Sequence, residues 1–193
     1  MKAISRFLLL PIILIPSILI AKEVPVGTIE ISGDLDISVT SFETKTEGTD
    51  NTDTDTQAVS ASFLYYPLNN IGIGLAWEYE SSESVTNGSK YEQTVNLIGP
   101  GVSFHFSVND NLNIKLIGAI AKSAAEFSSN GSTTEADGFA WVISGGIAYF
   151  VTESVSLDAS VRYLSISQEI DSDSTDIDSS GLATGLGLSV YLY

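Results

Sequence analysis

The chain has 193 residues and no cysteine, and its 24 acidic residues outnumber eight Lys and Arg, which gives a net charge of −16. This length suits a single domain, while the lack of cysteine excludes a disulfide framework, a thiolate metal site and a lipid anchor on cysteine. Nucleic acid is excluded as a partner because non-specific contacts with phosphate depend on Lys and Arg, and with 44% hydrophobic residues the apolar and acidic positions must be segregated along the chain.

The N-terminus has the pattern of a secretory signal. Lys2 and Arg6 precede an apolar run that ends at Ala21 and is shorter than the roughly twenty residues of a membrane-spanning helix. A basic start, a short apolar stretch and a small final residue predict cleavage after Ala21. We therefore expect residues 1–21 to be a cleaved signal peptide and residues 22–193 to be the exported domain. The alternative is an uncleaved membrane anchor.

Beyond the signal, large apolar residues alternate with small or polar ones, which is the period of β-strands. In one example, Ile73, Leu75 and Trp77 alternate with Gly, Ala and Glu. A change of this alternation at residues 99–101 (Gly-Pro-Gly) predicts a bulge, because proline cannot donate to a sheet ladder. The predicted strands cover residues 28–43, 57–66, 71–82, 91–106, 112–126, 138–150, 155–168 and 181–193.

The connections between these strands alternate in length. Tight turns rich in Pro, Asn, Asp and Ser alternate with longer polar loops. The turns occupy residues 67–70, 107–111 and 151–154, and the loops occupy 44–56, 83–90, 127–137 and 169–180. This pattern predicts an all-β fold, an eight-stranded antiparallel up-and-down transmembrane β-barrel with its long loops outside the cell.

The composition of the two strand faces favours a membrane barrel over a soluble one. One face is large and apolar, while the other holds Gly, Ala, Ser and charges. The small face fits the narrow lumen of eight strands. Lipid can solvate the large face, where Lys or Arg would cost about 2–4 kcal/mol near the midplane. Lys122 is the one base predicted on the lipid face, and it lies close to a loop.

Aromatic residues gather toward the two ends of the strands, as expected of two belts at the membrane–water interfaces. The predicted belt residues are Phe42, Tyr65, Trp77, Tyr79, Tyr91, Phe104, Phe106, Phe139, Trp141, Tyr149, Tyr163, Tyr191 and Tyr193.

With this strand count, loop pattern and aromatic C-terminus, residues 28–193 resemble the eight-stranded outer-membrane proteins that include OmpX, the OmpA transmembrane domain and neisserial opacity proteins. The resemblance implies a bacterial outer-membrane location, insertion by the barrel-assembly machinery, and contact with outer-membrane lipid and lipopolysaccharide. These proteins commonly finish with outward-facing apolar residues that end in Phe. In residues 187–193 the aliphatic residues occupy the other parity, so the register of the last strand stays open.

The face predicted to line the lumen carries acidic residues and two bases. They are Glu30, Asp34, Asp36, Glu78, Glu80, Glu92, Asp158, Lys115 and Arg162. The predicted cross-lumen pairs are Arg162 with Glu78 or Glu80, and Lys115 with Asp34 or Glu30. OmpA-like barrels carry a similar internal charge network, and the resemblance therefore implies a lumen that is closed by charge. The alternative is a narrow cation-leaky channel.

The acidic runs at residues 50–55 and 171–178 invite a calcium interpretation, since hard cations favour carboxylate oxygens. Neither run has the glycine and terminal glutamate of an EF-hand loop. We therefore expect no metal and no cofactor, and solvated loops that are available to an unidentified surface ligand.

A lipid-modifying outer-membrane enzyme is the alternative from a different class of function. The single histidine, His105, is predicted near the periplasmic end and points inward, whereas the enzymes of this kind use a histidine near the extracellular rim. A Ser-His-Asp site needs its groups within hydrogen-bond reach, and no such set is assembled. The sequence therefore predicts a barrel of structural or surface-interaction type, serving adhesion or recognition, and not an enzyme.

Overall fold

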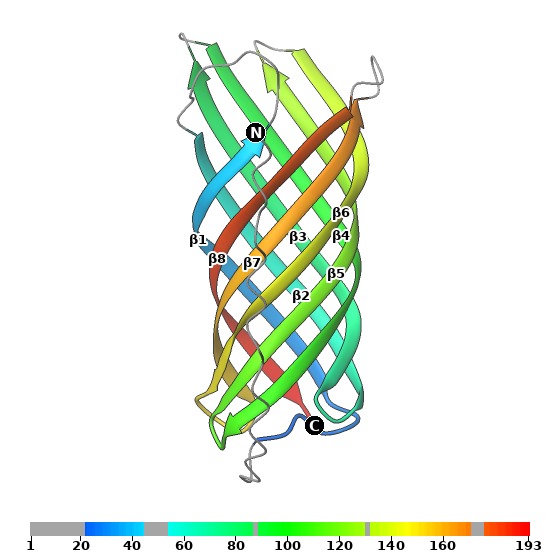
Figure 1. Ribbon diagram of the computed structural model, residues 1–193, viewed down its shortest axis with the longest axis vertical. Helices are drawn as coiled ribbons and strands as arrows, with labels where there is room; N and C mark the ends of the chain where they lie inside the picture. Colours follow the sequence, from blue (N-terminus) through cyan, green and yellow to red (C-terminus); the bar gives the residue numbers. More distant parts are fainter. Residues whose placement is uncertain (1–21, 45–53, 87–88, 130–131, 171–175) are drawn as a thin grey trace, which may run out of the picture.

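The structure, a computed structural model, describes residues 22–44, 54–86, 89–129, 132–170 and 176–193 (Figure 1). Eight antiparallel strands follow one another around a closed barrel in which the last strand pairs with the first. The strands are β1 (Ile29–Thr44), β2 (Thr54–Leu68), β3 (Ile71–Thr86), β4 (Ser89–Asn109), β5 (Leu112–Ser129), β6 (Ser132–Phe150), β7 (Val155–Ile170) and β8 (Asp176–Leu192). The predicted fold class is thereby confirmed. Among the described residues, no helix is long and apolar enough to cross a membrane.

Two of the four long loops expected from the sequence are largely strand. The β3–β4 hairpin pairs up to Thr86 and Ser89, and the β5–β6 hairpin pairs up to Ser129 and Ser132. The expected loops at 83–90 and 127–137 were therefore wrong. Hydrophobic alternation fades in these segments because both faces are polar, although Ser and Thr backbones pair as well as any others.

Large apolar side chains cover the outside of the barrel. Representative exposed residues from six strands are Leu35, Leu75, Ile98, Ile120, Ile143 and Leu186. The inward side chains are smaller, charged or packed against one another. The prediction that the large face points outward is confirmed, and this apolar wall is the surface that lipid can solvate.

The register of β8 is settled by the same division. Leu186, Leu188 and Leu192 are exposed on the outer wall, whereas Ser189 and Tyr191 are buried. The leucines of the last strand therefore face outward, and the positions that alternate with them, including Ser189 and Tyr191, face the lumen.

The bulge expected in β4 is absent from the described strand, so this expectation was wrong. Pro100 lacks an N–H, and pairing with β5 lapses between Ile98 and Gly101 but resumes in the same register. Gly99 lets the two strands approach closely, since a Cβ there would stand 2.0 Å from the carbonyl oxygen of Ile120. The alternation of β4 is therefore continuous. Each residue of β4 before Gly99 consequently faces the side opposite to the one that the expected bulge had given it.

Candidate functional site

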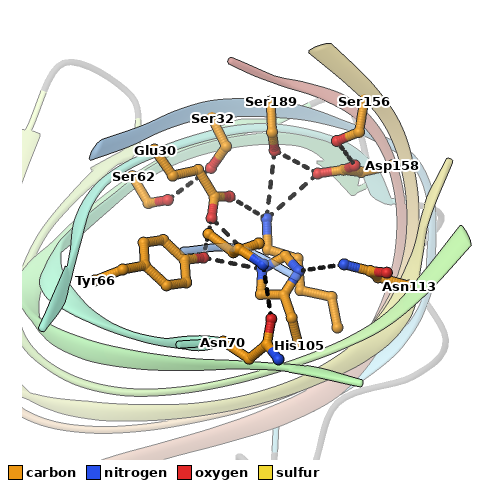
Figure 2. A network of polar contacts seen from close by, with 12 residues as sticks. Glu30, Ser32, Ser62, Tyr66, Asn70, His105, Asn113, Ser156, Asp158 and Ser189 are labelled. Atoms are coloured by element: carbon orange, nitrogen blue, oxygen red, sulfur yellow. Dashed lines mark hydrogen bonds and ion pairs between the residues drawn. The ribbon is translucent and has the colours of Figure 1, made fainter. Parts of the chain in front are cut away.

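A network of buried charges fills the lumen near the short-turn end (Figure 2). The Lys115 ammonium on β5 forms an ion pair with Glu30 on β1 and lies 3.3 Å from Asp158 Oδ2 on β7. Glu30 is completely buried, and it also accepts a hydrogen bond from the Tyr66 hydroxyl. Ser189 on β8 completes the ring of oxygens, with its Oγ 3.3 Å from the Lys115 ammonium. One ammonium thus joins oxygens from three strands.

His105 lies beside this network and is itself buried. Its Nε2 is 2.9 Å from the Tyr66 hydroxyl and 3.6 Å from Glu30 Oε2. On the other side of the ring, Asn113 Nδ2 is 3.5 Å from Nδ1. Both ring nitrogens are within reach of partners, so the imidazole is held as part of the packing. The position of His105 at the short-turn end, pointing inward, agrees with the expectation from the sequence.

A second ion pair lies further along the lumen. Arg162 on β7 reaches Glu78 on β3, with 3.0 Å between a guanidinium nitrogen and Glu78 Oε1, and both side chains are buried. The pair borders a cavity of about 80 Å³ that Asp34 also lines. Glycine at position 187 makes room for this acid, because a Cβ there would stand 1.6 Å from Asp34 Oδ1.

Toward the long-loop end the lumen contains an apolar cluster. A cluster of buried aliphatic residues projects inward from β4, β5, β6 and β7. Its members are Val95, Leu97, Ala121, Ala125, Ala140, Leu164 and Ile166, with Phe127 and Val142 packed against them. Gln168 on β7 donates a 2.6 Å hydrogen bond to Ser123 Oγ on β5 at the same end. Sequence reasoning missed this cluster, because the supposed bulge in β4 placed Val95 and Leu97 on the outer wall.

The structure places most of the lumen charges expected from the sequence on the lumen face. Of the alternatives considered for each base, Lys115 contacts Glu30 and Arg162 contacts Glu78. Glu92 is a correction: it is exposed on the outer face of β4, because the strand keeps its alternation through Pro100. The side chain of Asp36 lies outside the described residues. The lumen face holds Glu30, Asp34, Glu78, Glu80, Lys115, Asp158 and Arg162.

The expected belt aromatics divide into several groups. Those exposed on the outer wall are Tyr65, Trp77, Phe104, Phe106, Phe139, Trp141, Tyr149 and Tyr163. Tyr79 is partly exposed on the same wall, and Tyr193 is exposed at the chain end. Tyr91 is exposed but lies on the face of β4 that carries Val95. The side chain of Phe42 is outside the described residues.

Tyr191 is the correction among the aromatics, since it lies inside the barrel and not on the outer wall. Only 1% of it is exposed, and its ring packs 5.1 Å from that of Phe150 and 6.0 Å from that of His105. The cause is the parity of β8, in which Leu188 and Leu192 take the outward positions. Tyr66 and Phe150 are also buried in this part of the lumen.

A closed antiparallel barrel with an apolar outer wall and a polar, charge-filled lumen defines the class of outer-membrane β-barrels. A family model described as the outer membrane protein beta-barrel domain matches residues 23–189. The chain therefore belongs to this family, which implies a location in the bacterial outer membrane.

Solved structures of several outer-membrane proteins are similar to this chain. Neisserial surface protein A has a TM-score of 0.55 at 16% identity over 84% of this chain and 95% of its own. OprG from Pseudomonas aeruginosa has a TM-score of 0.52 at 11% identity over 88% and 97%. The N-terminal β-barrel domain of OprF from the same organism has 0.50 at 14% identity over 86% and 98%. At these identities the likeness shows the fold alone. No curated protein matches the sequence.

Proposed function

We propose that the protein is a closed outer-membrane barrel that acts as a scaffold for acidic loops at the cell surface, where it serves adhesion or recognition. The observation that carries the closure is the buried ring around Lys115, which joins β1, β5, β7 and β8 across the lumen. The arrangement is structural, because every charged group in it is held by another group of the barrel.

The contents of the lumen support this closure at three levels. The Lys115 ring lies at the periplasmic end, the Arg162–Glu78 pair follows it, and the aliphatic cluster lies toward the outside. A cavity of about 80 Å³ has room for only a few waters. A passing ion would have to displace buried ion pairs, and removing one partner of such a pair costs about 3–5 kcal/mol.

The outer rim carries a further concentration of negative charge. Acidic side chains exposed near the extracellular ends of the strands are Glu92, Glu126, Glu135, Asp137, Glu169 and Asp178. With a net charge of −16, such a rim favours a basic surface ligand, or lipopolysaccharide whose phosphates are bridged to the carboxylates by divalent cations. Export by a signal peptide cleaved after Ala21 and insertion by the barrel-assembly machinery belong to the same proposal.

Two other functions compete with this one. A narrow cation-leaky channel would also use an excess of luminal acids, and the partly exposed acids Asp34 and Glu80 favour it. A lipid-modifying enzyme would need an accessible catalytic group, whereas His105 is buried beside Tyr66 and Asn113. The enzyme is therefore the weaker alternative.

Conductance of single molecules in planar lipid bilayers tests the closure. We expect no steady current through the folded protein in concentrated potassium chloride, because each level of the lumen is occupied. The triple variant Lys115→Ser, Arg162→Ser and Leu97→Ser should admit cations, since it removes one long side chain from each of the three levels, whereas Arg162→Ser alone should stay closed because the other two levels remain occupied. Lys122→Ser, which removes an exposed base from the outer wall, is the matched control and should stay silent. Steady cation conductance of the unmodified protein would overturn the closed lumen in favour of the channel.

A further inference from the structure

The residues that precede β1 cross the periplasmic mouth of the barrel. Val24 is completely buried and packs into a cluster at the foot of the lumen formed with Leu64, Tyr66, Ala148, Phe150 and Tyr191. Two residues further on, Val26 is 58% exposed. A completely buried valine between the exposed residues Glu23 and Pro25 indicates that the segment packs into the barrel.

The segment is fastened on one side to the turn between β2 and β3. The Val24 N–H donates to Asn70 Oδ1 at 2.8 Å, and the Asn70 N–H donates to the Val24 carbonyl, also at 2.8 Å. Asn70 has a φ of 63°, a left-handed conformation that asparagine tolerates better than most residues. Asn69 Oδ1 accepts a third hydrogen bond, from the Val26 N–H at 3.0 Å. The turn therefore holds the segment through hydrogen bonds to the backbone of Val24 and Val26.

The other fastening lies on the β4–β5 hairpin. The Lys22 carbonyl accepts hydrogen bonds from Ser107 Oγ at 2.5 Å and from Asn113 Nδ2 at 3.1 Å. The Lys22 ammonium lies 5.0 Å from the centre of the Phe150 ring on β6, a distance at which a cation is attracted to the face of an aromatic ring. Contacts with β2–β3 at one end and β4–β6 at the other mean that residues 22–28 span the opening.

The polar groups directly inside this opening are those of the buried network (Figure 2). Asn113 contacts both the Lys22 carbonyl and the His105 ring, so one side chain joins the segment to the network. Tyr66 likewise packs with Val24 and hydrogen-bonds Glu30. Water that entered the mouth would compete for these buried hydrogen bonds.

We propose that residues 22–28 are a releasable strap that closes the periplasmic mouth and shields the His105–Glu30–Lys115 network from periplasmic water. Residues 22–26 are held by hydrogen bonds and the buried Val24 side chain, so they can leave their seat without unpairing any strand, while Gly27 and Thr28 stay hydrogen-bonded to Tyr66 of β2 and act as the hinge. This inference goes beyond the proposed function, because a barrel that conducts ions would be served by the same strap.

The single histidine of the chain provides the test. Carbethoxylation of His105 by diethyl pyrocarbonate, followed by peptide mass spectrometry on the folded protein in micelles, measures its access to water. Val24→Asp should raise the rate by about tenfold or more, because an unpaired carboxylate is expelled from an apolar seat. Val26→Asp is the matched control: the same charge two residues away, on an exposed side chain, should leave the rate within about twofold.

Asn70→Gly supplies a second variant that adds no charge. Glycine keeps the left-handed turn but removes the acceptor for Val24, so the His105 rate should rise several-fold. Retention of the heat-dependent gel shift would show that each variant is folded. Wild-type rates for both folded Val24→Asp and Asn70→Gly would overturn the strap. Because the readout is the reaction of one imidazole and not ion flow, that failure would leave the closed lumen untouched.

Discussion

Replacing Lys115 by methionine is expected to lower the free energy of unfolding by about 3–5 kcal/mol, because it removes the cation that two buried carboxylates share. Glu30 is completely buried and Asp158 is nearly so, and both contact the Lys115 ammonium. Without that ammonium, each acid would have to remain unpaired in the lumen or take up a proton. Methionine keeps most of the volume of lysine, so the loss would report charge more than packing.

Urea unfolding of the barrel refolded into phospholipid vesicles, followed by tryptophan fluorescence, measures this effect. Lys122→Met is the matched control, because Lys122 also forms an ion pair, with Asp137 at 3.5 Å, but the two side chains are 64% and 58% exposed. An exposed pair contributes at most about 1 kcal/mol. Adding Glu30→Gln to Lys115→Met should restore part of the loss. Equal effects of Lys115→Met and Lys122→Met would contradict a buried structural network.

The second large effect is expected on the outer wall, at Ile143. This residue lies on β6 midway between the outward aromatic residues Tyr149 and Phe139, and it is exposed. Ile143→Arg should destabilise the barrel by about 2–4 kcal/mol, the cost of arginine near the middle of a bilayer. Asn96→Arg is the control, because Asn96 is also exposed on the outer face but lies on β4 toward the extracellular end.

For Asn96→Arg the expected loss is only about 0–1 kcal/mol, since the cost falls near the interface. The same urea titration in vesicles compares the two variants. In detergent micelles, which lack a bilayer of fixed thickness, the difference should shrink. If Ile143→Arg were as stable as Asn96→Arg in vesicles, the lipid-facing assignment of this wall would be wrong.

Strand periodicity predicted much of the fold, because successive residues of a barrel strand face lipid and lumen alternately. The prediction failed at the rim, where both faces of a strand are polar. The segments 83–90 and 127–137 stand at the polar rim, where both faces are hydrophilic and alternation carries no signal, yet their backbones are paired. Pro100 misled for a different reason: the missing N–H suggested a bulge, whereas the strand passes it in unchanged register.

The site was predictable only in part, because contacts across the lumen depend on how strands that are not neighbours in the sheet face each other. The acids and bases of the lumen could be identified by parity, but the approach of Asp158 to Lys115 depends on how β5 and β7, which are separated by β6, face each other inside the lumen. The aliphatic cluster was hidden by the misassigned parity of Val95 and Leu97. The seat of Val24 had no local signal, because it depends on turns and strands that are far away in sequence.

Depth-dependent quenching of the two tryptophans most directly tests the central claim, that the large face of every strand meets lipid. Trp77 and Trp141 both lie exposed on the outer wall, and they are the only tryptophans of the chain. In vesicles of brominated phospholipid, Trp77→Phe and Trp141→Phe should each leave a remaining tryptophan that bromine quenches strongly and aqueous iodide quenches little. Tryptophans that were insensitive to brominated lipid in the folded barrel would place the large face inside and contradict the account.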